Sequence, residues 1–158
     1  HLAILHGREV VYVIEERARG KPPLVTDVGV RLPAPLTASG RAILAMLPAA
    51  QVRALFPDRD AFVERHGGGP ATPTALRQLL ADTRTRGYAI EDGEVTPGYA
   101  SVAVAVEVPP SATTFASVAV TYDRARISPA PDDLAADVRT AADAIAARVG
   151  GGAPPGRG

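Results

Sequence analysis

Two alternating segments constrain most strongly what this chain can fold into. Residues 100–108 and residues 116–122 both carry Val at every second position, with small or hydroxyl side chains between. Because neighbouring side chains of a strand point to opposite faces, one face is β-branched and the other carries Ser101, Ala119 and Thr121. We predict that these strands form a central antiparallel pair. The face of small residues leaves room for a packed helix or for a ligand cavity.

The remaining chain predicts an α+β protein. Hydrophobic periodicity and capping residues give the other elements. They are a hairpin over Leu2–Ile14, an extended segment at Val28–Leu32, a helix capped by Thr37, a short helix over Ala49–Phe56, a helix running from Thr72-Pro73 to Gly87, and a last helix opening at Asp132-Asp133. The order hairpin, helices, strands, helix predicts an antiparallel sheet with helices covering at least one face.

Length and charge narrow the function classes. The 158 residues fit one domain, and 17 basic residues balance 17 acidic ones, so a basic nucleic-acid surface spread over the chain is not expected. Cysteine is absent, which excludes disulfides and thiolate zinc sites and fits a reducing compartment. No apolar run is long enough for a membrane span, and no signal peptide is visible. We therefore expect a cytoplasmic protein without membrane contact.

Catalytic motifs are missing from the sequence. It contains no GxSxG, HExxH or GxxxxGK[ST] motif, and its three histidines, His1, His6 and His66, have no spacing typical of a metal site. We expect no metal, no cofactor and no enzymatic activity. The alternative is an α+β hydrolase with Ser39 or Ser101 as nucleophile and Glu91 in support, but no histidine is placed as its base.

The predicted helix start after Thr37 is a candidate binding feature. Ala38, Ser39 and Gly40 place three small residues in its first turn. Free N–H groups and the helix dipole favour an anion at such an end. The alternative is that small residues merely allow the helix to pack closely on the sheet, and both interpretations stay open here.

Four segments, in this order, resemble the C-terminal effector-binding domain of IclR-type transcriptional regulators. They are LAILHGREVVYV (Leu2–Val13), VGVRLPAPLTASGRAILAMLP (Val28–Pro48), RGYAIEDGEVTPG (Arg86–Gly98) and SVAVTYDRARIS (Ser117–Ser128). The resemblance runs from about Leu2 to Val149. It implies a GAF/PAS-like α+β sensor fold, a curved antiparallel sheet flanked by helices, over residues 2–149, followed by a flexible tail at 150–158.

The resemblance also implies a ligand pocket and places it residue by residue. The pocket positions are Leu24, Leu32, Ala38, Ser39, Glu91, Tyr99, Ser101, Ala119 and Thr121. Relatives often have Asp where this chain has Glu91, and Cys where it has Ser101. Some relatives bind zinc, but this chain does not have their zinc ligands, so we expect no metal.

What such a domain does is also implied by the resemblance. It would sense a small carboxylate or aromatic acid as homodimer or dimer of dimers, and so activate or repress transcription. DNA would be bound only through an N-terminal winged helix-turn-helix, which this chain lacks. The alternative within the same family is an oligomerisation module whose pocket is vestigial.

Overall fold

The computed structural model describes residues 1–21 and 27–150. Six strands, four α-helices and two 3-10 turns follow one another in the order hairpin, helices, strands, helix. They are β1 (Leu2–His6), β2 (Glu9–Ile14), β3 (Arg31–Pro33), η1 (Ala34–Leu36), α1 (Ala38–Met46), α2 (Ala49–Leu55), η2 (Arg59–Ala61), α3 (Pro73–Arg86), β4 (Ala89–Asp92), β5 (Tyr99–Ala105), β6 (Ala116–Asp123) and α4 (Pro131–Gly150). The α+β prediction is confirmed.

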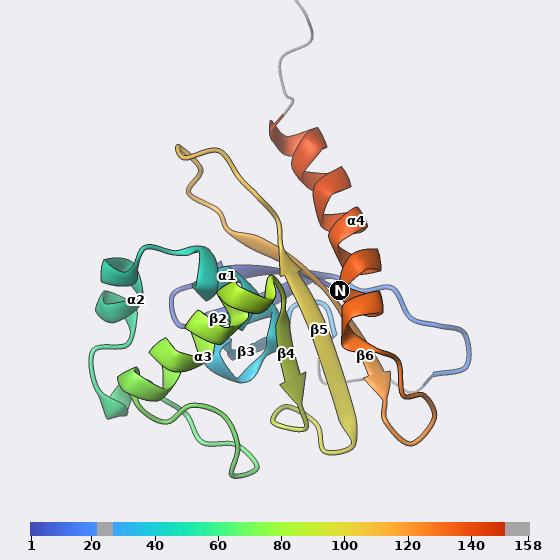
Figure 1. The fold of residues 1–158 in the computed structure, drawn as a ribbon, viewed down its shortest axis with the longest axis horizontal. Helices are drawn as coiled ribbons and strands as arrows, with labels where there is room; N and C mark the ends of the chain where they lie inside the picture. Colours follow the sequence, from blue (N-terminus) through green and yellow to red (C-terminus); the bar gives the residue numbers. More distant parts are fainter. Residues whose placement is uncertain (22–26, 151–158) are drawn as a thin grey trace, which may run out of the picture.

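The strands form one curved antiparallel sheet in the order β3-β2-β1-β6-β5-β4 (Figure 1). Two local meanders build it, β1-β2-β3 from the start of the chain and β4-β5-β6 from its second half. They join where Leu2, Ala3 and Ile4 pair with Val118, Ser117 and Ala116. The predicted strand pair is β5 and β6, and it lies towards the middle of the sheet.

Helices cover both faces of the sheet. The alternation of small and β-branched side chains along the strands determines which helix packs on which face. The β-branched face, with Val102 and Val104, packs against Ala135, Val138 and Ala142 of α4. The small-residue face packs against α1 through a cluster made only of alanines, Ala38, Ala42, Ala89, Ala103 and Ala119. Figure 1 shows α4 beside β6, well apart from α1 and α3. Short side chains on both surfaces let α1 lie close to the strands.

The start of α1 is fixed by a cap and by one close approach. Thr37 has extended backbone angles, and its Oγ1 accepts a hydrogen bond of 2.8 Å from the Gly40 N–H. Gly40 lies against η1, because a Cβ built at Gly40 would stand 2.2 Å from the Ala34 carbonyl oxygen. The glycine therefore allows η1 to pass directly beside the first turn of α1.

Three sequence predictions differ from the structure or lie outside it. The extended segment expected over Val28–Leu32 is shorter, and the strand covers Arg31–Pro33. The chain turns just before it, because Gly29 has a φ of +87° and the Val30 N–H donates to the Asp27 carbonyl at 3.0 Å. The pocket position Leu24 and tail residues 151–158 lie outside the described residues.

The close approach at Gly40 makes a stability prediction. Gly40→Ala should lower the free energy of unfolding by about 2 kcal/mol, because the new methyl overlaps backbone atoms of η1 that cannot move freely. Urea denaturation of the purified domain measures the change. Gly150→Ala is the matched control, since a Cβ there meets nothing within 4 Å. An unchanged midpoint for Gly40→Ala would contradict the packing described for α1.

Candidate functional site

A small cavity lies between the start of α1 and the small-residue face of the sheet. Its free volume is about 20 Å³, enough for one water molecule. Its walls come from β2, α1, β4, β5, β6, the loop after β4 and the residue before β1. The lining residues are His1, Tyr12, Thr37, Ala38, Ser39, Glu91, Val95, Thr96, Tyr99, Ser101, Ala119 and Thr121.

The first turn of α1 forms the polar roof of this cavity. The Thr37 side chain satisfies the Gly40 N–H, and the Thr37 carbonyl accepts from the Arg41 N–H at 3.0 Å. Ala38 and Ser39 occupy the first two helical positions, whose N–H groups have no acceptor within a helix. Because both residues line the cavity, this end of the helix dipole faces it.

Two hydroxyl groups form the opposite wall. Ser101 on β5 pairs directly with Thr121 on β6, and their oxygens are 2.8 Å apart. One of the two hydroxyls donates to the other, so the accepting group keeps its own proton for a further partner. Ala119, two residues before Thr121 on the same face, leaves open space beside the pair.

Glu91 is the buried acidic group of the cavity. Its residue is 3% exposed, and its Oε1 accepts a hydrogen bond of 2.9 Å from the Val95 N–H. Burial raises the pKa of the Glu91 carboxyl to about 7, and the neighbouring Glu94 adds to the rise, whereas the Val95 N–H and Arg41 oppose it. The carboxyl is therefore about half protonated near neutral pH.

Arg41 holds the cavity walls together without lining the cavity. It is 4% exposed and comes from the first turn of α1. Its Nε donates to the Pro35 carbonyl at 2.8 Å, and its guanidinium donates to the Ile90 carbonyl at 2.7 Å and to Glu94 at 3.1 Å. One side chain thus joins η1, α1, β4 and the loop after β4.

Sequence reasoning missed five lining residues: His1, Tyr12, Thr37, Val95 and Thr96. Tyr12 is 3% exposed on β2, and burial raises the pKa of its phenol to about 12, partly offset by the Ser39 and Thr37 hydroxyls. The His1 ring stands edge-on to Tyr12, and its buried Nδ1 has no hydrogen-bond partner. The inward position of Tyr12 in the alternating hairpin was the available signal.

The structure brings together seven of the nine predicted pocket residues. They are Ala38, Ser39, Glu91, Tyr99, Ser101, Ala119 and Thr121. Leu32 does not line the cavity, because it pairs with Val10 on β2 and packs into the main hydrophobic core. Leu24 lies outside the described residues.

A wider groove adjoins the cavity. It has a volume of about 250 Å³ and lies between residues 15–21 and the end of β6. His1, Tyr99 and Thr121 line both the groove and the cavity, so they stand between the two spaces.

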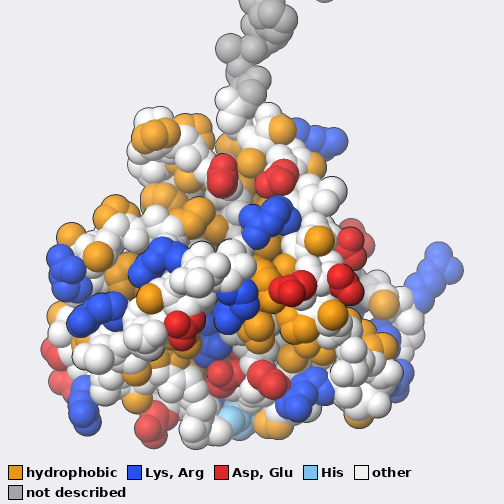
Figure 2. Space-filling model, in the orientation of Figure 1, with side chains coloured by type: hydrophobic (Ala, Val, Ile, Leu, Met, Phe, Trp, Pro, Cys, Tyr) orange, Lys and Arg blue, Asp and Glu red, His pale blue; other side chains and the backbone are white. Residues whose placement is uncertain are grey.

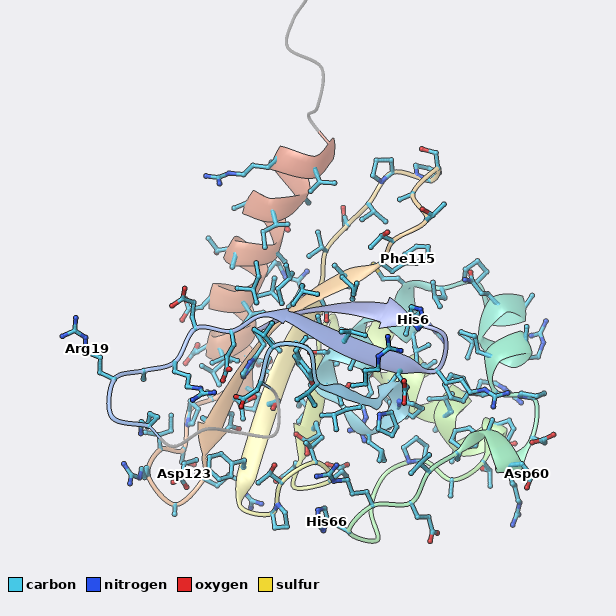
Figure 3. The ribbon with its side chains drawn as sticks, turned by 180° about the vertical axis from the view of Figure 1, so that it is seen from behind. His6, Arg19, Asp60, His66, Phe115 and Asp123 are labelled. Carbon is cyan, nitrogen blue, oxygen red and sulfur yellow. The ribbon has the colours of Figure 1, made fainter. Side chains whose placement is uncertain are left out.

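The described residues show neither a metal-binding cluster nor a membrane-spanning helix. Within residues 1–21 and 27–150, no three His, Asp or Glu side chains are placed to hold a metal ion. His6 is the last residue of β1, whereas His66 lies in a turn before α3, and the two are well separated in Figure 3. Basic and acidic side chains are interspersed on the face shown in Figure 2. No helix among the described residues has both the length and the apolar character that crossing a bilayer requires.

Comparisons with known proteins place this α+β fold among domains of bacterial transcriptional regulators. The chain belongs to the IclR family: residues 1–147 match the family described as "Bacterial transcriptional regulator IclR C-terminal". The HTH-type transcriptional regulator XynR of Escherichia coli K12 is 37% identical over 108 residues, which are 67% of this chain and 42% of that protein.

Solved structures agree with this assignment. The repressor BlcR of Agrobacterium tumefaciens is 30% identical with a TM-score of 0.72, covering 94% of this chain and 58% of that one. An IclR homologue from Microbacterium hydrocarbonoxydans, complexed with 4-hydroxybenzoate, shares the fold at 22% identity and a TM-score of 0.74, covering 89% and 56% of the two chains. The chain thus spans about half the length of the curated relatives it matches.

The raised pKa of Glu91 predicts how stability depends on pH. Because the folded-state pKa lies above the unfolded value of 4.5, the domain should lose stability as pH rises from about 4.5 to about 7. Glu91→Gln removes this loss of stability. At pH 8 the variant should be more stable than the wild type by about 2 kcal/mol, a value that already allows for screening by cavity water. Near pH 4 the two proteins should be equally stable. Thermal unfolding across this pH range measures both. Parallel curves would contradict the burial of this carboxyl.

The hydrogen bonds of Arg41 predict a large loss on substitution. Arg41→Met should lower the free energy of unfolding by about 3 kcal/mol, since it orphans the Pro35 and Ile90 carbonyls and leaves Glu94 without its cation. Arg124→Met is the control, because the Arg124–Asp92 pair is exposed and should contribute under about 1 kcal/mol. Equal losses in the two variants would refute the bridging role. Urea denaturation measures the difference.

Proposed function

We propose that this domain binds a small organic acid in the cavity below α1 and thereby regulates transcription by the longer protein. One observation carries the proposal. The α1 N-terminus, a buried carboxyl and a hydroxyl pair lie around one small cavity. Free N–H groups favour a ligand carboxylate or carbonyl, and hydroxyls add directional hydrogen bonds. We propose no catalytic step.

The ligand class takes support from one relative. The Microbacterium hydrocarbonoxydans homologue is complexed with 4-hydroxybenzoate, a small aromatic acid. By analogy, the carboxylate of such an acid would lie against Ala38 and Ser39, with Ser101 and Thr121 on its other side. Tyr99 would form an apolar wall, and Leu24 remains a proposed wall residue.

The size of the cavity requires a wall to move before such a ligand fits. About 20 Å³ admits only a water molecule, so an aromatic acid needs displacement of the side chains that adjoin the wider groove. This small volume favours a second candidate function, an oligomerisation module whose pocket is vestigial. The two candidates differ in whether an acid stabilises the domain.

The activity of the whole protein is part of the proposal. XynR is named an HTH-type regulator, and this chain matches 42% of it, so we propose that DNA is bound by a separate helix-turn-helix domain. The described surface shown in Figure 2 mixes charges of both signs, consistent with little DNA contact by this domain. We propose a homodimer or dimer of dimers that works in the cytoplasm.

A thermal-shift screen tests the ligand. Acetate, pyruvate, benzoate and 4-hydroxybenzoate are each titrated into the purified domain, and an acid at 100 times its Kd should add about 2.7 kcal/mol of stability. Thr121→Val keeps the shape of the side chain but removes its hydroxyl, so the Kd of the stabilising acid should rise about tenfold.

Ser117→Ala is the matched control for this variant. It also removes a buried hydroxyl from β6, but that hydroxyl does not line the cavity. The stabilising acid should bind Ser117→Ala with the same Kd as the wild type. If no acid raises the unfolding temperature, the vestigial-pocket alternative replaces the ligand-binding proposal.

A further inference from the structure

Glu91 is a buried carboxyl, and the nearby cation, Arg41, directs its hydrogen bonds to other groups. Arg41 acts on it electrostatically, but the donors of Arg41 are directed to the Pro35 carbonyl, the Ile90 carbonyl and Glu94. Among the described residues, the hydrogen bond that Glu91 receives comes from the Val95 N–H to Oε1. Among the described residues no arginine or lysine lines the cavity, and the backbone ammonium of His1 donates to the Ala119 carbonyl at 2.9 Å.

The other groups around Glu91 do not neutralise its charge either. Glu94, from the loop after β4, is a like charge. Tyr12, from β2, stays a neutral phenol because burial raises its pKa to about 12. Tyr99, from β5, and His1, before β1, also line the cavity. Burial lowers the pKa of the His1 backbone ammonium, and the buried His1 Nδ1 has no hydrogen-bond partner. The cavity lining therefore holds one carboxyl. Burying its neutral form costs less free energy than burying its charged form.

A ligand carboxylate would add a second negative charge to this space. Two like charges held close together in a space shielded from water repel each other strongly. When Glu91 is protonated, the repulsion disappears, and the same group donates a charge-assisted O–H···O hydrogen bond to the incoming anion. The α1 N-terminus then faces a single negative charge, that of the ligand.

We propose that Glu91 carries the proton with which this cavity accepts an organic anion, so that ligand binding takes up one proton from solvent. The proposal deepens the proposed function and rests on it. The proton moves from water or buffer to the Glu91 carboxyl, where it is shared with the ligand carboxylate, and no other bond changes. Glu91 thereby selects monoanionic acids over neutral analogues as pH falls.

Calorimetric titration tests the linkage with two acids and their neutral counterparts. Acetate and 4-hydroxybenzoate are titrated into the domain at about pH 6 and about pH 8, each compared with acetamide or 4-hydroxybenzamide. The Kd of each acid should be about tenfold weaker at the higher pH, because Glu91 titrates near 7 in the free domain. HEPES and Tris have different ionisation enthalpies, so the heats at pH 8 should report uptake of about 0.9 proton. The carboxamides should show no such weakening.

Two variants separate Glu91 from other carboxyls. Glu91→Gln mimics the protonated form and should bind each acid with the same Kd at both pH values and without proton uptake. Glu64→Gln removes an exposed carboxyl outside the cavity and should behave like the wild type. The proton count on the wild type tests the proposal independently of how well the variants fold.

The outcomes distinguish this proposal from the proposed function. If the acids bind the wild type equally at both pH values without proton uptake, the proton-carrying role of Glu91 is overturned while the ligand-binding function stands. If Glu91→Gln keeps the pH dependence, another group carries the proton and the proposal is likewise overturned. If neither acid binds at either pH, the proposed function fails, and the linkage fails with it.

Discussion

The buried guanidinium of Arg41 is the interaction on which the cavity depends. It reaches from α1 to carbonyls of η1 and β4 and to Glu94, so it fixes three walls with one planar group. A lysine could not satisfy three divergent acceptors with the same rigid geometry. Because these donors are committed to the scaffold, Glu91, the one acidic residue that lines the cavity among the described residues, receives no hydrogen bond from Arg41. The same arrangement that builds the site therefore sets its electrostatic character.

The alanine cluster is the second requirement for the cavity. Ala42, Ala89 and Ala103 bring α1 so close to β4 and β5 that their interface is filled by methyl groups alone. Towards the start of α1, Ser39, Ser101 and Thr121 replace such contacts with hydroxyls, and the space widens into the cavity. Of the two interpretations of the small residues at this helix start, close packing is confirmed, and anion binding stays a prediction. Close packing holds along the helix, and a polar opening lies at its end.

Residue patterns predicted the parts of the molecule that depend on local physics. Thr37, Thr72 and Gly87 cap helices as expected, and the alternation in β5 and β6 placed Ser101 and Thr121 on one face. The burial of Arg41 was not predictable, because a charged residue in a first turn is ordinarily exposed and its three acceptors come from distant segments. Leu32 was placed in the pocket by resemblance, but pairing with Val10 turns it into the core. Val95 and Thr96, from the loop after β4, reach the cavity through tertiary packing that periodicity does not encode.

The pairing of β1 with β6, the seam that joins the two meanders, affects the order in which the molecule folds. Each three-stranded half forms from neighbouring stretches, whereas β1 meets β6 across a separation of more than one hundred residues, 118 for the contact of His1 with Ala119. Closing such a long loop is entropically costly, so this pairing belongs to a late step of folding. On the ribosome, the first hairpin is made long before its partner emerges. It must wait with one edge unpaired, and the cavity, which draws walls from both halves, comes into existence only when the seam closes.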